Sequence, residues 1–334
     1  MSPQAFWSRK GPLNFLLLPL SLLFAVLVAL RRWAYRNKLL RSGHPGVPVI
    51  VAGNLTAGGS GKTPFVIWLV QWLQAQGRRP GVVSRGYGRE EGGLHEVSEA
   101  STAAQAGDEP VLVHLKTGVP VVAGTDRLAA ARLLRARHPE VDVIVSDDGL
   151  QHYRLQRDLE LVLADDAARF GNGWLQPAGP LREPLSRLKK ADALILSVRG
   201  AHEGAAVSDA LPVFRVRHRA GICYRLLDPQ QTCALGELAG RRVLAVAGVA
   251  RPDAFFAQLE NAGLDVRRLG FPDHHAYRPG DIDATATVVM TEKDAVKCRQ
   301  FAGPEWWVLK LELQPDPQLE NWLVEKLAQL AEKT

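Results

Sequence analysis

Cysteine is scarce in this chain of 334 residues, and its scarcity excludes two classes of protein. The three cysteines, Cys223, Cys233 and Cys298, form no CxxC pair or cysteine–histidine cluster, so neither a disulfide framework nor a structural zinc site is indicated. Internal repeats and low-complexity runs are also lacking. With 46% hydrophobic and 23% charged residues, the composition is typical of a folded protein, and the length allows about two domains. The few, widely spaced cysteines indicate a reducing compartment.

Acidic residues are absent from the first 89 positions, where twelve lysines and arginines precede the first acidic residue, Glu90. The net charge of +6 comes from this end, because the rest of the chain is acidic on balance. A basic region confined to one end predicts contact with a localised anionic surface rather than with nucleic acid.

An uncharged apolar segment lies between two basic pairs near the N-terminus. Residues 12–30 would form a helix about 28 Å long, close to the thickness of a bilayer's hydrocarbon core. Arg31 and Arg32 follow where a signal peptide would need small residues, which disfavours cleavage. Three interpretations stay open: a spanning helix, a helix lying in the membrane interface, and a buried core helix. In both membrane cases the basic flank, residues 31–41, places the rest of the chain in the cytoplasm.

A glycine-rich segment follows the next apolar run. Residues 47–52 read as a strand, residues 53–63 (GNLTAGGSGKT) as a phosphate loop, and residues 65–73 as a helix. Backbone N–H groups of such a loop surround a phosphate chain, its lysine reaches the β- and γ-phosphates, and its last hydroxyl holds Mg²⁺. The strict pattern has glycine where this chain has Thr56. The predicted ATP-binding residues are Thr56, Ala57, Gly58, Gly59, Ser60, Gly61, Lys62 and Thr63.

Two adjacent carboxylates end an apolar strand-like run after the loop. Asp147 and Asp148 directly follow residues 141–146, as the second metal-holding element of a phosphate-loop enzyme does. A turn residue followed by a helix cap is the alternative. Because like charges side by side are unfavourable without a cation, the pair predicts an Mg²⁺ site that includes the hydroxyl of Thr63.

Two further polar residues stand at the starts of predicted helices. Asp108 precedes the apolar residues 111–115, where it could simply be a helix cap. Arg127 opens the helical residues 128–132 and could be an exposed charge or a phosphate clamp.

Taken together, the motifs resemble the tetraacyldisaccharide 4′-kinase family of lipid A biosynthesis. The resemblance extends over nearly the whole chain in the family's order, and the family's loop also lacks the first glycine. It is carried by VIVAGNLTAGGSGKTP (49–64), SRGYG (84–88), GDEP (107–110), SDDGLQH (146–152), PAGPLRE (177–183), GVARP (248–252), FPDH (271–274) and MTEKDAVK (290–297).

This resemblance implies an ATP- and Mg²⁺-dependent lipid kinase at the bacterial inner membrane, with its catalytic domain on the cytoplasmic side. The implied reaction is phosphorylation of the 4′-hydroxyl of a tetraacyl glucosamine disaccharide 1-phosphate to give lipid IVA. Asp108, assisted by His274, would deprotonate the hydroxyl, and Lys62 would act on the phosphates. Expected substrate contacts are Arg85, Arg127, Gln151, His152 and Arg182. No obligate protein partner is implied.

The alternative function is a membrane-tethered phosphate-loop nucleotide switch without kinase activity. The chain lacks an NKxD-type element that reads guanine in a suitable place, and a sugar acceptor explains Asp108 better.

The expected fold is α/β, with a P-loop core containing a parallel sheet, a smaller α/β domain and an N-terminal membrane-associated helix. We divide the chain into residues 1–41 (membrane helix), 42–216 (kinase core), 223–300 (smaller domain) and 301–334 (a segment returning to the core), with a linker near 217–222. Residues 277–286 leave little room for a helix. Closure of the two domains is expected to bring His274 to Asp108, although the adjacent His275 leaves the choice of histidine open.

Overall fold

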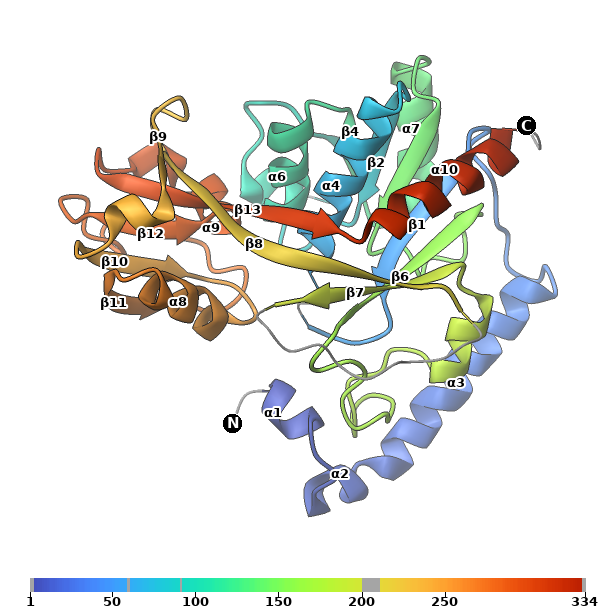
Figure 1. Cartoon of the computed structure of the whole chain (residues 1–334). Helices are drawn as coiled ribbons and strands as arrows, with labels where there is room; N and C mark the ends of the chain where they lie inside the picture. The colour runs from blue at the N-terminus through green and yellow to red at the C-terminus, as the bar shows by residue number, and fades with distance from the viewer. Residues whose placement is uncertain (1–2, 59–60, 91, 200–210, 332–334) are drawn as a thin grey trace.

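The computed structural model describes residues 3–58, 61–90, 92–199 and 211–331. One sheet continues through two lobes, in the strand order β11-β10-β12-β13-β8-β7-β6-β1-β5-β2-β4-β3, with β9 paired to β8 (Figure 1). The predicted α/β class with a mostly parallel sheet is confirmed. Gly59 and Ser60 lie outside the described residues.

The first lobe is built on a parallel sheet with β1 near its centre. Most of its strands are buried along their whole length, as expected for a sheet covered on both faces. The strands are β1 (Val49–Asn54), β2 (Pro80–Ser84), β3 (His95–Glu96), β4 (Val121–Ala123), β5 (Val143–Asp147), β6 (Leu159–Asp165) and β7 (Ala193–Val198). Only β3 pairs antiparallel among these.

Helices cover both faces of this sheet. One face packs against α4 (Lys62–Ala75), α6 (Asp108–Thr117) and α10 (Pro317–Ala331), and the other against α7 (Arg127–Arg137). The short α5 (Ala103–Ala106) precedes α6. Because β5 and β6 flank β1 in parallel, the carboxyl ends of these strands meet at one edge, where open α/β sheets bind their ligands.

The second lobe repeats the layered arrangement on a smaller scale. Strands β10 (Arg242–Ala247), β11 (Asp265–Gly270) and β12 (Val288–Thr291) lie between α8 (Pro252–Asn261) on one face and α9 (Glu292–Cys298) on the other. Residues 277–286 contain no helix, as predicted. The other elements are β9 (Thr232–Ala234) and three short 3₁₀ helices, Leu185–Lys190, Leu235–Leu238 and Arg299–Phe301.

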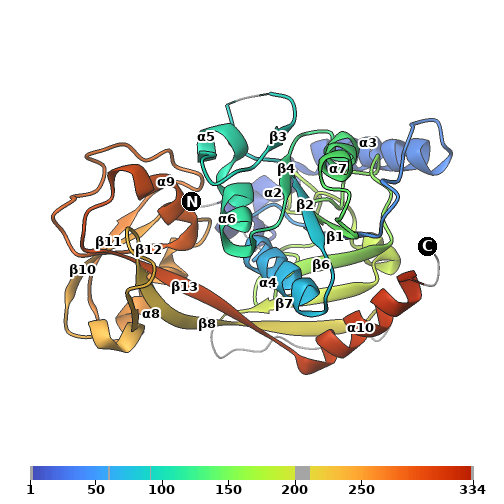
Figure 2. The same cartoon turned by 90° about the horizontal axis from the view of Figure 1, so that it is seen from above.

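A two-stranded ribbon joins the lobes. The strands β8 (Val213–Arg225) and β13 (Trp306–Pro315) pair antiparallel and run from one lobe to the other (Figure 2). The linker predicted at 217–222 is therefore wrong, because these residues lie inside β8. The sequence of this stretch, RHRAGI, has no run of β-branched or aromatic residues to predict a strand, and only its pairing with β13 makes it one. A register shift between Leu309 and Leu311 puts a bulge in β13.

The N-terminal apolar segment forms two helices rather than one. Helix α1 (Pro3–Trp7) precedes α2 (Pro12–Leu16), and α3 (Leu18–Arg36) extends beyond the predicted end. Figure 1 shows α3 lying alongside the first lobe. Of the described residues, α3 alone is long and apolar enough to cross a membrane by length and composition.

Polar side chains attach this helical segment to the first lobe. The Asn14 amide donates to the Ala178 carbonyl over 2.9 Å, and the Ser21 hydroxyl donates to the Leu175 carbonyl over 2.9 Å. The opposite side is apolar and exposed, with Leu16 and Leu22 retaining 74% and 67% of their accessible surface. The segment is therefore neither a buried core helix nor detached from the protein.

Candidate active site

The glycine-rich loop connects β1 to α4 at the carboxyl edge of the sheet. Gly61 has a φ of 79°, in the left-handed region, and a Cβ there would lie 2.7 Å from the Ser197 hydroxyl. Glycine is thus required both by the backbone turn and by the strand behind it. The following residues Lys62 and Thr63 open α4, whose N-terminal dipole favours an anion at this point.

The first residues of the predicted ATP-binding set are tied to a neighbouring segment. Thr56 forms an isolated bridge with Leu181, and the Ala57 N–H donates to the Pro180 carbonyl over 2.8 Å. Since that N–H is already engaged, the donors available to a phosphate begin after Ala57.

Lys62 and Asp148 meet beside the loop. The Lys62 ammonium lies 3.2 Å from a carboxylate oxygen of Asp148 and donates to the Asn54 amide oxygen over 3.0 Å. The Arg182 guanidinium contacts both Asp148 oxygens at 3.1 Å. Although burial raises the pKa of Asp148, the two positive charges hold it well below its usual range. Asp148 is therefore ionised at neutral pH.

Asp147 ends β5 with a carboxylate that lacks a full set of partners. Its exposed fraction is 1%, one oxygen accepts a hydrogen bond from the Ser84 hydroxyl over 3.2 Å, and the other has no hydrogen-bond partner among the described residues. Burial, followed by the negative charge of Glu109, raises the pKa of Asp147 to about 7. A cation beside the free oxygen would favour the ionised form.

The donor set here fits Mg²⁺. An orphaned carboxylate oxygen, the neighbouring Asp148 and the Thr63 hydroxyl are hard oxygen donors. Within the described ranges no group of three or more acidic, histidine or cysteine residues is arranged for a metal ion. Mg²⁺ at nucleotide sites is held by one or two protein carboxylates together with substrate phosphates.

Asp108 and His274 are in contact across the lobes. The His274 Nδ1 lies 3.1 and 3.0 Å from the two carboxylate oxygens of Asp108, whose exposed fraction is 3%. Burial opposes its ionisation, but the hydrogen bond from His274 lowers the pKa of Asp108. The same bond raises the pKa of His274 against the effect of burial. The pair is already formed in this structure, so domain closure is not required to assemble it.

The local backbone explains why Asp108 points toward the second lobe. It is the first residue of α6. Gly107 before it has a φ of 92°, and a Cβ added to Gly107 would lie only 2.9 Å from the Cα of Gly86. Tyr87, next to Gly86, places its ring 4.8 Å from that of His274. The neighbouring His275 is directed elsewhere, 3.1 Å from Asp281. His274 is thus the histidine that meets Asp108.

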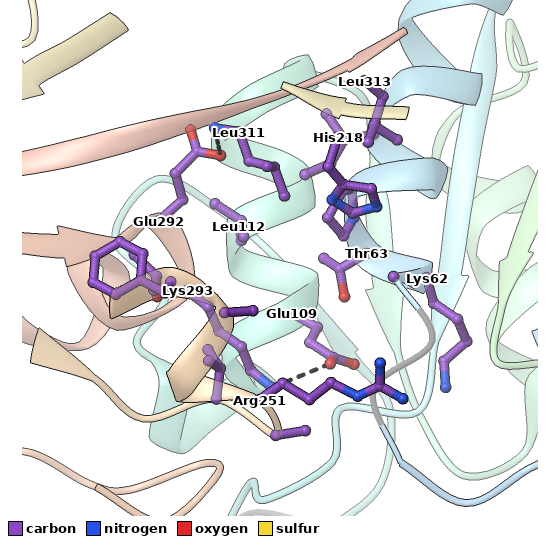
Figure 3. Close-up of a pocket in the computed structure, with 18 of the residues that line it drawn as sticks. Lys62, Thr63, Glu109, Leu112, His218, Arg251, Glu292, Lys293, Leu311 and Leu313 are labelled. Atoms are coloured by element: carbon purple, nitrogen blue, oxygen red, sulfur yellow. Dashed lines mark hydrogen bonds and ion pairs between the residues drawn. The ribbon is translucent and has the colours of Figure 1, made fainter. Parts of the chain in front are cut away.

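Lys293 connects this pair to the phosphate side. Its ammonium lies 3.3 Å from Glu109, 3.0 Å from Asp273 and 3.3 Å from the His274 Nε2. A cavity of about 1260 Å³ between the lobes contains Lys62, Thr63, Glu109, His274 and Lys293 in its wall. In Figure 3 the Lys293 side chain points toward Glu109, and Lys62 and Thr63 lie in the wall of the same cavity.

A second cavity of about 560 Å³ lies between α3 and the first lobe. Phe24, Val28 and Arg31 line it from the helix. Its wall shares Arg85, Asp148 and Arg182 with the interlobe cavity, so the two spaces meet at these residues.

Three more of the predicted substrate residues occupy different positions. Gln151 lines the second cavity and donates to the Asn54 carbonyl over 3.3 Å. His152 also lines it, and burial together with the charge of Arg127 lowers its pKa to about 4, so the ring is neutral. Arg127 itself is buried behind Asp147, donating to the Gly124 and Asp147 carbonyls. It faces neither cavity, and its role as a phosphate clamp stays a prediction.

Three site residues were missed by the sequence argument: Asn54, Glu109 and Lys293. Each lies within a motif that carries the family resemblance. The pattern that could have identified them is a polar side chain at the carboxyl end of a strand, for Asn54, or in the first turn of a helix, for Glu109 and Lys293. No local pattern indicates that Lys293 would reach the first lobe.

Phosphoryl transfer requires a cradle for phosphates and a base for the acceptor, and the interlobe cavity brings the glycine-rich loop close to His274, the contact partner of Asp108. Fold and site together define a P-loop kinase acting on a hydroxyl group. The family model of tetraacyldisaccharide-1-P 4′-kinase matches residues 13–328. The chain belongs to that family.

Individual relatives agree with this membership over nearly the full length. The chain is 54% identical to the tetraacyldisaccharide 4′-kinase of Thiobacillus denitrificans over 98% of this chain and 99% of the relative, and 46% identical to that of Methylobacillus flagellatus over 98% and 96%. A solved structure of LpxK from Aquifex aeolicus in complex with ATP superposes with a TM-score of 0.82 at 30% identity, covering 95% of this chain and 99% of that one. These matches support a lipid kinase and not a nucleotide switch.

Proposed function

We propose that the protein transfers the γ-phosphoryl group of ATP to the 4′-hydroxyl of a tetraacyl glucosamine disaccharide 1-phosphate, giving lipid IVA. One observation carries this proposal: His274 lines the same cavity as Lys62 and Thr63 and contacts the buried Asp108 at 3.0 Å. A nucleotide switch does not require a carboxylate–imidazole pair beside its phosphate loop. A kinase acting on a sugar hydroxyl does, because the hydroxyl is a poor nucleophile and needs a proton acceptor.

The residues divide the reaction into two tasks. Asp108 accepts the hydroxyl proton while the acceptor oxygen bonds to the γ-phosphorus and the bond to the β-phosphate oxygen breaks, releasing ADP. His274 keeps Asp108 oriented and ionised by donating to it. Lys62, at the N-terminus of α4, neutralises charge on the β- and γ-phosphates. Thr63, Asp147 and Asp148 would hold Mg²⁺, which supplies further positive charge to the phosphates.

A direct assay tests the proposal. Purified protein is incubated with Mg-ATP and the tetraacyl disaccharide 1-phosphate, and the lipid is analysed by mass spectrometry. We expect a product heavier by one phosphate group, located at the 4′ position. ATP hydrolysis without a phosphorylated lipid would contradict the proposal and favour the switch.

The acceptor is proposed to occupy the second cavity. That cavity extends from Arg85 and Arg182, beside the phosphate loop, to apolar and basic side chains of α3. An amphiphile with a sugar headgroup matches this distribution, because its hydroxyl end meets the arginines that also face the nucleotide cavity. Among the described residues, Arg31 has no carboxylate partner, whereas Arg32 approaches Glu183 at 3.9 Å.

Arg31 is therefore expected to bind the phosphate that the acceptor already carries. Replacing it with alanine should lower kcat/KM for the 1-phosphorylated acceptor by about tenfold or more, the loss of one charge-assisted hydrogen bond. The same change should matter little for an acceptor lacking the 1-phosphate. Arg36→Ala removes an equal charge from the same helix without touching the cavity and should affect both acceptors alike. Equal losses for both acceptors in Arg31→Ala would contradict this assignment.

We further propose that α3 lies in the membrane interface on the cytoplasmic side of the bacterial inner membrane and does not span it. Residues on both sides of the apolar segment touch the same lobe. Before it, the Trp7 indole donates to the Pro177 carbonyl over 3.0 Å, and beyond it the Tyr35 ring lies 5.8 Å from that of Tyr153. A segment anchored at both ends to one lobe cannot place that lobe on one side of a bilayer and its own N-terminus on the other.

Protease accessibility tests this orientation. An epitope fused to the N-terminus should be digested in inverted inner-membrane vesicles and protected in intact spheroplasts, because an interfacial helix keeps both ends on the cytoplasmic side. A periplasmic marker protein in the same preparations reports whether the membranes are sealed. Digestion in spheroplasts would show that the helix spans the membrane.

A further inference from the structure

Four groups surround the His274 imidazole in the described structure. Asp108 of α6 faces Nδ1, with its nearer oxygen at 3.0 Å. On the other side, Nε2 lies 3.8 Å from the carboxylate of Asp273 and 3.3 Å from the ammonium of Lys293 on α9. The Tyr87 ring packs 4.8 Å away. The ring therefore lies between two carboxylates, with one lysine beside the nitrogen that does not contact Asp108.

The positions of the two carboxylates would by themselves favour an imidazolium. Each ring nitrogen would then donate to one carboxylate, and both protons would be stabilised. A charged imidazole would pair strongly with Asp108 and weaken that carboxylate as a proton acceptor. Lys293 prevents this arrangement, because its ammonium lies 3.0 Å from Asp273 and stands against Nε2.

An ammonium group has only donors, so a ring nitrogen at hydrogen-bond distance from it must present a lone pair. Lys293 stays charged, since the carboxylates of Glu109, Asp108 and Asp273 raise its pKa above the usual lysine range despite burial. Nε2 is then the acceptor, and the single ring proton is on Nδ1, directed at Asp108. The hydrogen bond with Asp108 raises the pKa of His274, but a second proton on Nε2 would point at the Lys293 ammonium 3.3 Å away, so the contact geometry opposes the doubly protonated ring. The opposite tautomer would place a lone pair against the Asp108 carboxylate and would require Asp108 to be protonated, which removes the base.

We propose that Lys293 is a positioning residue that fixes His274 as the neutral Nδ1–H tautomer and so keeps Asp108 available as the base. This inference rests on the proposed function of Asp108. Lys293 sets the tautomer through its contact with Nε2, and its ammonium also lies 3.8 Å from an Asp108 oxygen, which Lys297 of α9 approaches at 4.0 Å. The contact of Lys293 with Glu109 at 3.3 Å anchors the second lobe against α6.

The first test is the pH dependence of transfer in Lys293→Met and Lys293→Arg. Without the positive charge, protonation of both His274 and Asp108 becomes easier, so the acid limb of the kcat profile should move to higher pH by about one unit. At neutral pH we expect kcat to fall about tenfold and to recover partly toward about pH 9. Lys293→Arg keeps the charge and should keep the limb near its wild-type position.

A purely structural role would give a different result. If Lys293→Met lowers kcat by the same factor at every pH and leaves the limb unmoved, the proposal is wrong. Unchanged kcat and an unchanged profile would overturn it as well.

The second measurement does not depend on turnover or on any Lys293 variant. Nitrogen-15 NMR of the histidine-labelled wild-type protein reports which ring nitrogen carries the proton, with His274→Gln used to assign the signal. A protonated Nδ1 and an unprotonated Nε2 are expected at neutral pH. Protons on both nitrogens, or on Nε2 alone, would overturn the proposal. Failure of the proposed function would instead appear as absent lipid phosphorylation in wild type, whatever the tautomer.

Discussion

Asp108→Asn should lower kcat for lipid phosphorylation by about 10²–10⁴-fold, the range that a positioned general base contributes. Asparagine has nearly the shape of aspartate, so the fold and the first turn of α6 are retained, but its amide cannot accept the hydroxyl proton. Binding of ATP should change little, because Lys62 and the loop are separate from Asp108. Kinetics with the lipid acceptor, together with nucleotide binding by calorimetry, measure the two effects.

The chain offers a matched control for this change in the neighbouring pair, where Asp281 lies 3.1 Å from His275. Asp281→Asn removes a carboxylate from a histidine in the same segment but away from the phosphate loop, and it should leave turnover close to wild type. If Asp108→Asn also turned over near the wild-type rate, another group would have to accept the proton.

Lys62→Ala should remove almost all transfer, with kcat lowered by at least about 10²–10³-fold, as for other groups that stabilise charge developing in a transition state. The variant also leaves Asp148 with Arg182 as its remaining direct cationic partner, which disturbs the metal-holding residues. A radiolabelled-ATP assay measures the loss of transfer.

Lys326→Ala is the control for Lys62→Ala, because Lys326 packs over the Trp322 ring on α10 and faces neither cavity. It should retain full activity. Substantial phosphorylation by Lys62→Ala would mean that the glycine-rich loop does not hold the transferred phosphate, and the assignment of the nucleotide site would fail.

The parts of the site that the sequence predicts are those encoded by short motifs. Gly61 is required by a left-handed turn against Ser197, and Asp147 follows a run of buried β-branched residues. In both cases the chemistry and the local backbone depend on adjacent residues, so a single segment contains the information. The parallel sheet then brings the two segments together, because residue 147 is paired in register with Ala52.

Contacts between distant segments were beyond such reasoning. Nothing near Lys293 indicates that its side chain reaches Glu109, because that contact depends on how α9 packs against α6. The N–H of Ala57 is likewise engaged by Pro180, far along the chain. Residues 217–222 were misread because a long exposed strand and a polar linker have similar compositions, and only pairing with β13 distinguishes them.

The ribbon formed by β8 and β13 has a consequence for how the enzyme's two halves depend on each other. The two strands pair with each other, and β8 also pairs with β7 of the first lobe while β13 also pairs with β12 of the second. Unfolding of either lobe would remove hydrogen-bond partners of the ribbon strands that the other lobe also uses, so we expect the two lobes to unfold together. The proposed proton acceptor, Asp108, comes from one lobe and its imidazole, His274, from the other. Unfolding of either lobe is therefore expected to separate this pair as well.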